Sequence, residues 1–156
     1  MRREHHRIQP SPFPRPAREP VDFQVVFRKS AQLQLLLDPS FVILDASDAY
    51  LAATMTVREH IVGHHLFEIF PDNPDDSRAD GVNNLRSSLL RVMQTRAADA
   101  MPIQKYDVRR PGEALFEERY WRPLNWPILG DDGYVSLIVH QVEDVTQLIK
   151  SGKLKP

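Results

Sequence analysis

The hydrophobic positions of this chain fall into short runs separated by turn residues. Residues 35–37 and 41–44 are apolar and flank Asp38-Pro39-Ser40, a pattern that predicts a β-hairpin. Residues 134–142 form a second apolar stretch, which predicts a buried strand followed by the acidic and hydroxyl-bearing segment 144–146. β-structure is therefore expected near both ends of the sequence.

A longer helix is expected between these β-segments, over residues 80–96. Ser77 has an acidic residue three positions later, so the pair resembles a capping box and favours a helix start near Ser77. The apolar residues that recur at helical spacing are Val82, Leu85, Leu89, Val92 and Met93.

Two further strands are predicted after this helix, over residues 103–109 and 116–128. Gly112 and the segment 131–133 supply the turns that follow them. Pro123 lies inside the longer strand and cannot donate a backbone hydrogen bond. It therefore indicates a bulge, a bend or a sheet edge.

A short amphipathic helix is predicted over residues 21–29, ahead of the hairpin. Its apolar stripe is formed by Phe23, Val26 and Phe27, and its polar side chains are expected to turn away from the domain. The last strand is apolar on both faces, so both faces of the sheet need cover. We expect the leading helix, a second copy of the chain, or both to cover the outer face, which predicts a homodimer.

The composition indicates one domain. The chain has 156 residues, of which 42% are hydrophobic and 26% charged, enough for one core of ordinary size. No apolar run approaches the roughly 20 residues that span a bilayer, and no apolar stretch follows the basic N-terminus. We therefore expect a cytoplasmic protein that does not enter a membrane. The absence of Cys excludes disulfides, thiolate catalysis and flavin–cysteinyl photochemistry.

Residues 1–20 differ from the rest in composition. They contain five of the 13 prolines and carry a net positive charge, which predicts an extended, flexible leader. The remaining residues carry a net negative charge. Binding of nucleic acid by the folded part is therefore not expected, because the phosphate backbone requires a basic face.

Taken in order, these segments resemble the PAS family of sensory domains. The hairpin at 35–46 resembles the opening pair of the PAS sheet, and 45–54 resembles the stretch in which an Asn precedes a short helix. Residues 58–71 resemble the helical middle of that fold, and 119–125 begin a strand like those of PAS domains attached to bacterial histidine kinases. Asp144-Val145-Thr146 resembles the Asp-x-Thr motif at the end of the last PAS strand.

The resemblance implies an α+β fold. We expect a five-stranded antiparallel sheet with short helices and one longer helix on one face, preceded by the N-terminal amphipathic helix. Ser47 stands where the family usually has Asn, and either residue can cap the following helix. The expected organisation is a leader over 1–20, the PAS domain over 21–148, and the start of a C-terminal linker or signalling helix over 149–156.

The resemblance implies a sensor and not an enzyme. Asp144 and Thr146 are expected to pass a change in the sheet to an attached output, such as the histidine kinase of a two-component system. Asp144 needs a partner at the end of an apolar strand, and Arg119, Arg122 or a backbone N–H could supply it. Thr146 is expected to cap the helix that follows. The residues after it are too few for a kinase, so we expect a piece of a larger protein or a stand-alone adaptor.

Ligand identity stays open in the sequence. Haem requires an axial imidazole in an apolar pocket, and His64 and His65 follow the Gly63 turn where some haem-binding PAS sensors carry that ligand. A flavin, another small molecule, or no ligand at all are the alternatives, and no metal site is expected. The pocket candidates are Tyr50, Phe67, Leu85, Leu89, Tyr120, Trp126 and His140.

Overall fold

Most of the predicted elements form where the hydrophobic pattern places them. The structure is a computed structural model that describes residues 19–156, so most of the predicted leader lies outside the described residues. Within this part, no helix is long and apolar enough to cross a membrane. The elements are α1 Phe23–Arg28, β1 Leu33–Leu37, β2 Ile43–Ala46, α2 Asp48–Thr54, α3 Arg58–Ile61, α4 Leu66–Ile69, α5 Gly81–Thr95, β3 Asp99–Ala100, β4 Gln104–Lys105, β5 Val108–Arg109, β6 Phe116–Glu117, β7 Tyr120–Leu129, β8 Val135–Asp144 and α6 Thr146–Lys150.

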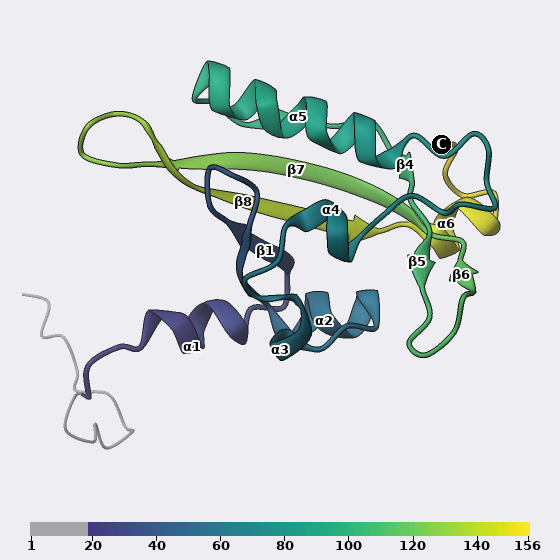
Figure 1. Cartoon of the computed structure of the whole chain (residues 1–156), viewed down its shortest axis with the longest axis horizontal. Helices are drawn as coiled ribbons and strands as arrows, with labels where there is room; N and C mark the ends of the chain where they lie inside the picture. Colours follow the sequence, from purple (N-terminus) through teal and green to yellow (C-terminus); the bar gives the residue numbers. More distant parts are fainter. Residues whose placement is uncertain (1–18) are drawn as a thin grey trace, which may run out of the picture.

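One antiparallel sheet organises the chain. Its strand order is β2-β1-β8-β7-β3, and β4 also pairs with β7. The predicted hairpin is confirmed, with Leu35 paired to Ala46 on one side and to His140 of β8 on the other. The two longest strands, β7 and β8, run side by side through the domain with α5 along them (Figure 1). The first hairpin therefore pairs directly with the last strand, although about 100 residues separate them in sequence.

The strand next to β7 is divided, which differs from the five strands expected. Ala100 of β3 pairs with Leu124, Gln104 of β4 pairs with Trp121, and the chain leaves the ladder between them. Pro123 accepts a hydrogen bond from the Met101 N–H at this break but has no N–H to return. The expectation of a continuous strand over 103–109 is therefore wrong. Its second half forms a separate two-stranded sheet, β5 with β6.

The core lies between one face of the sheet and the helices. Leu35 and Leu37 from β1 and Ile138 from β8 are fully buried against this layer, together with Leu89 and Val92 of α5. The start of α5 differs from the capping box expected at Ser77. Its first turn is instead bonded by Asp72, whose carboxylate accepts from the Val82 N–H.

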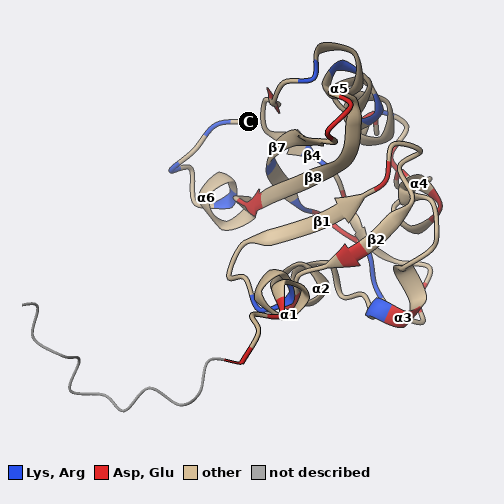
Figure 2. Cartoon of the chain, turned by 90° about the vertical axis from the view of Figure 1, so that its left-hand side faces the viewer, with Lys and Arg blue, Asp and Glu red and all other residues tan. Residues whose placement is uncertain are grey.

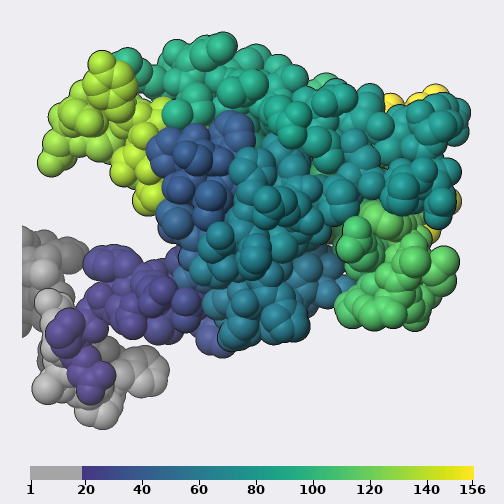
Figure 3. All heavy atoms as spheres, in the orientation of Figure 1, coloured from purple at the N-terminus to yellow at the C-terminus, as the bar shows by residue number. Residues whose placement is uncertain are grey.

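Helix α1 is held to the domain by its polar side, the reverse of the expectation. Gln24 and Arg28 donate to Asp45 at the end of β2, and Lys29 donates to Asp48 of α2. Phe23 is 77% exposed, and Val26 is also exposed. Helix α1 projects from the body of the domain (Figure 3), and Phe23 and Val26 of its apolar stripe face away from the sheet, whereas Phe27 is half-buried.

Candidate functional site

A cavity of about 50 Å³ lies between the inner face of β7 and β8, helices α2 and α4, and the start of α5. A volume of this size suits a small ligand. Tyr50 and Trp121 belong to its wall, and most of the wall is aromatic or aliphatic. The lining residues are Tyr50, Thr54, Leu66, Phe70, Gly81, Leu85, Met101, Gln104, Tyr106, Asp107, Val108, Trp121, Pro123, His140 and Val142.

A chain of hydrogen bonds runs from His140 through the core to the surface. The Asn125 amide nitrogen donates to the Ser88 hydroxyl at 2.8 Å, and that hydroxyl donates to Asp99 at 2.5 Å. The Asn125 oxygen is thereby left to accept from His140 Nδ1, at 2.6 Å. Arg91 donates twice to Asp99, both at 2.9 Å, where the chain reaches the surface.

These bonds fix the state of the His140 ring. Its Nδ1 carries the hydrogen, so Nε2 is an acceptor. Burial lowers the pKa of His140 to about 4 because the charged imidazolium would lose its hydration. The wall of the cavity therefore contains a neutral imidazole at pH 7.

Asp107 is the charged residue of the wall. Its side chain is 8% exposed, and one carboxylate oxygen accepts from Asn73 at 2.9 Å and lies 3.6 Å from the Lys105 ammonium. The other oxygen, Oδ1, is buried without a hydrogen-bond partner. An unbonded, buried carboxylate oxygen is costly, so Oδ1 marks a position where a donor would be stabilising.

The structure brings three of the seven predicted pocket residues to the cavity: Tyr50, Leu85 and His140. Leu89 is buried in the neighbouring core. The other three do not line the cavity. Phe67 packs under the Arg86 guanidinium, Tyr120 lies at the end of the sheet beside Thr146, and Trp126 pairs with Val139 outside the core cluster.

The two histidines considered for haem lie outside this cavity. His64 is exposed, and its ring nitrogen is 3.9 Å from Glu68. His65 accepts from the Phe67 N–H through Nδ1 and so caps α4. Neither histidine therefore presents an axial ligand to this cavity. Among residues 19–156, no group of His, Cys, Asp or Glu is arranged to hold a metal ion.

The end of β8 forms a bonded junction around Asp144. One carboxylate oxygen accepts from Arg119 at 2.7 Å, and the other accepts from the Thr146 N–H at 3.0 Å. Burial raises the pKa of Asp144, but these hydrogen bonds outweigh it and hold the pKa below its usual range. Thr146 does not cap α6 as expected. It is the first residue of that helix, and its hydroxyl accepts from the Tyr120 N–H at 2.9 Å.

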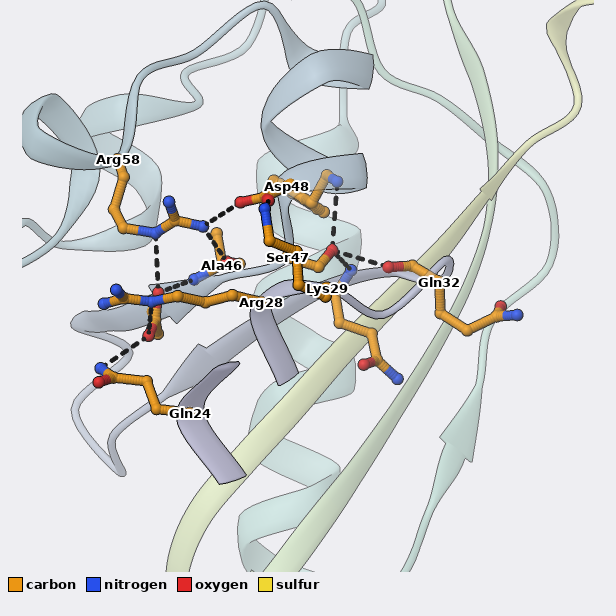
Figure 4. Close-up of polar contacts among 11 residues, drawn as sticks. Gln24, Arg28, Lys29, Gln32, Ala46, Ser47, Asp48 and Arg58 are labelled. Atoms are coloured by element: carbon orange, nitrogen blue, oxygen red, sulfur yellow. Dashed lines mark hydrogen bonds and ion pairs between the residues drawn. The ribbon is translucent and has the colours of Figure 1, made fainter. Parts of the chain in front are cut away.

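A second polar cluster, around Asp45, attaches α1 to the domain. One oxygen of Asp45 accepts from Arg28 at 2.8 Å, and the other accepts from Arg58 at 3.0 Å (Figure 4). Figure 2 shows this acidic end of β2 beside basic segments of α1 and α3. Arg58 and Lys29 also donate to Asp48 and lower its pKa to about 2. Sequence reasoning missed this cluster, because its members are far apart in the chain.

Solved structures share the fold of this chain at low sequence identity. The PAS domain of a protein from Colwellia psychrerythraea is similar with a TM-score of 0.63 and 11% identity, over 80% of this chain and 95% of that one. A sensory box sensor histidine kinase from Vibrio cholerae has a TM-score of 0.54 and 16% identity, over 80% and 89%. The LOV protein of Rhodobacter sphaeroides has a TM-score of 0.58 and 14% identity, over 83% and 71%. No protein-family model and no curated protein matches the sequence.

The chain therefore has the PAS fold, which confirms the fold that the order of the motifs predicted. The antiparallel sheet with short helices and one longer helix is also as expected, apart from the divided strand next to β7.

Proposed function

We propose that this chain is a sensory module in which occupancy of the cavity is transmitted to the segment after β8. The observation that supports this proposal is a single pair of residues on neighbouring strands. Trp121 lines the cavity, and its partner across β7 and β8 is Asp144, the residue that begins the exit junction. A displacement of the Trp121 ring therefore acts on the strand position that holds Asp144.

The residue next to Trp121 bonds the junction directly. The Tyr120 N–H donates to the Thr146 hydroxyl, and the Tyr120 carbonyl accepts from the Val145 N–H at 2.9 Å. Val145 is fully buried. These contacts fasten the first turn of α6 to the start of β7, so a shift at this end of β7 changes the position of α6.

The proposed output is an effector attached after α6, of which a histidine kinase is the example that we favour. Support comes from the order of the elements, which places the junction at the end of the sheet, and from the similarity to the sensory box histidine kinase of Vibrio cholerae. In this proposal the domain itself senses and does not catalyse.

We also propose that two copies associate through α1. Its polar side is bonded to Asp45 and Asp48, so Phe23 and Val26 have no cover from the rest of the described chain. A two-fold pair would place these same residues against their copies and remove their apolar surface from water.

Amide hydrogen exchange tests the coupling between cavity and junction. Leu85→Phe adds volume at the cavity wall and is expected to change exchange rates over residues 144–149. Asp144→Ala is expected to speed exchange over residues 143–149 and to abolish the response to Leu85→Phe, while Ile138 and Val139 stay protected. Glu143→Ala is the matched control, because Glu143 forms only an exposed pair with Arg122 at 3.4 Å.

Two outcomes would contradict the coupling. If Asp144→Ala loosens the whole domain, the carboxylate is a support of the core and not of the junction. If Leu85→Phe leaves the junction unchanged in the otherwise native chain, the cavity and the exit are independent.

Sedimentation tests the association. Phe23→Glu introduces a charge on the exposed stripe and is expected to shift the protein to monomer. Leu115→Glu is the control, since Leu115 is 59% exposed on the β5–β6 side. A protein that is already monomeric, or a dimer that survives Phe23→Glu, would remove α1 from the interface.

A further inference from the structure

The wall of the cavity combines aromatic rings with one negative charge. Tyr50, Phe70, Tyr106 and Trp121 all belong to it. Asp107 is its one formally charged residue, and none of the described lining residues is Lys or Arg. Aromatic faces attract cations through their quadrupole, and a buried carboxylate attracts them through its charge.

Two acceptors of this wall have no donor from the described residues. Asp107 Oδ1 is buried without a donor, and the His140 ring presents Nε2 as an acceptor because Asn125 takes the Nδ1 hydrogen. Two donors of the wall are already used: the Tyr106 hydroxyl donates to the Phe70 carbonyl, and the Trp121 indole N–H donates to the Tyr106 carbonyl at 2.8 Å. The Tyr50 hydroxyl can still donate or accept, but none of the described lining residues is a cation, so a positive charge for Asp107 Oδ1 must come from a ligand.

We infer that the cavity binds a small organic ammonium cation, whose N–H groups reach Asp107 and whose alkyl part packs among the aromatic rings. This inference deepens the proposed sensory function and rests on it. The cavity volume of about 50 Å³ favours a small ligand.

Lys105 is the internal competitor of such a ligand. Its ammonium bonds Asp76 at 2.5 Å and lies 3.6 Å from the Asp107 oxygen that Asn73 already occupies. Removing the Lys105 charge would leave Asp107 more strongly negative without changing the aromatic wall. The affinity for a bound cation is expected to rise with that change, whereas a purely structural role of the cluster predicts a loss of affinity.

Ethylammonium chloride is a suitable probe, with ethanol as the neutral molecule of matched size and sodium acetate as the anion. The chain has two tryptophans, so a Trp126→Phe background leaves Trp121 as the reporter inside the cavity. We expect ethylammonium to shift the Trp121 emission with saturation. Ethanol and acetate are expected to bind at least about tenfold more weakly, at constant ionic strength.

Substitutions test how the charge of the site, apart from its shape, affects ethylammonium binding. Asp107→Asn is expected to weaken ethylammonium binding by about tenfold or more, because a charged hydrogen bond is lost. Lys105→Met is expected to tighten it. Asp131→Asn, on the exposed β7–β8 turn, is the matched control and is expected to have no effect.

The two variants keep the inference falsifiable if one of them folds poorly, because their expected effects have opposite signs. Ethanol binding as tightly as ethylammonium, no saturable response to ethylammonium, or a Lys105→Met variant that binds no tighter would each overturn it. Saturable binding of ethanol or acetate alone would refute the ligand class while leaving the sensory proposal intact. Failure of the hydrogen-exchange coupling would refute that proposal instead.

Discussion

Replacing His140 is expected to flatten the pH dependence of folding stability between pH 5 and 8. The imidazole is buried, and burial lowers its pKa to about 4, whereas an unfolded histidine has a pKa near 6.5. Between these values the unfolded chain binds a proton at this position and the folded chain does not. Stability is therefore full above about pH 6.5 and is lost as the pH falls towards 4.

The size of the effect follows from the separation of the two pKa values. A difference of about 2.5 units corresponds to roughly 3 kcal/mol over the whole range, and to about 2 kcal/mol at pH 5. For a chain of this length, 2 kcal/mol lowers the midpoint of thermal unfolding by roughly 4–8 °C. The depressed pKa values of Asp45 and Asp144 have the same sign but act at lower pH, because their contribution is present above the unfolded carboxyl pKa and is lost as the pH falls through the folded pKa.

Urea unfolding at pH 5, 6, 7 and 8 measures this slope for the native chain and for His140→Gln. The glutamine amide can still donate to Asn125, and the other five histidines of the sequence are retained. We compare slopes and not absolute stabilities, so a general destabilisation by the variant does not matter. Equal losses from pH 8 to pH 5 in the two proteins would refute the reasoning, as would a His140 proton resonance that titrates above pH 6.

Four further substitutions test contacts seen in the structure, each by chemical denaturation. Asp45→Ala is expected to cost roughly 1.5–3 kcal/mol because it removes the buried carboxylate that accepts from Gln24, Arg28 and Arg58, whereas Lys29→Met, at an exposed pair, should cost less than about 1; equal costs would contradict this. Ser47→Ala is expected to cost roughly 1–2 kcal/mol, since the hydroxyl caps α2, and a neutral result would remove that role. Gly81→Ala is expected to cost roughly 1–3 kcal/mol, because its Cβ would lie 2.4 Å from the Tyr106 ring, and an unchanged stability would show that the ring moves freely.

Local signals predicted the elements that depend on neighbouring residues. The hairpin around Asp38, the cap at Ser47 and the long helix each follow from residues a few positions apart. The division of the strand next to β7 depends instead on pairing between strands. Pro123 was recognised as a break in hydrogen bonding, but the strand that it interrupts is the one paired beside it, between Ala100 and Gln104. Strand pairing is needed to place that effect.

The site was less predictable because its polar partners come from distant segments. The hydrophobic stripe of α1 was expected to cover the sheet, to meet a second copy of the chain, or both, with the polar side chains turned away from the domain. The carboxylates of Asp45 and Asp48 reverse this orientation of the helix, because Arg28 and Lys29 turn toward the domain to pair with them. In the same way, the sequence gives Asp107 only as one polar position of the predicted strand over 103–109, and its burial in the cavity wall follows from the fold.

The cavity touches the anchors of both flanking helices. Tyr50 lies on α2, whose first residues include Asp48, the carboxylate that holds Lys29 of α1. Trp121 lies on β7 opposite Asp144, which holds the first turn of α6. A ligand that displaces both rings would therefore act on α1 and on α6 together. In the proposed coupling, a ligand that contacts only Trp121 would act on α6 alone, so the ring that a ligand contacts would determine which helix responds.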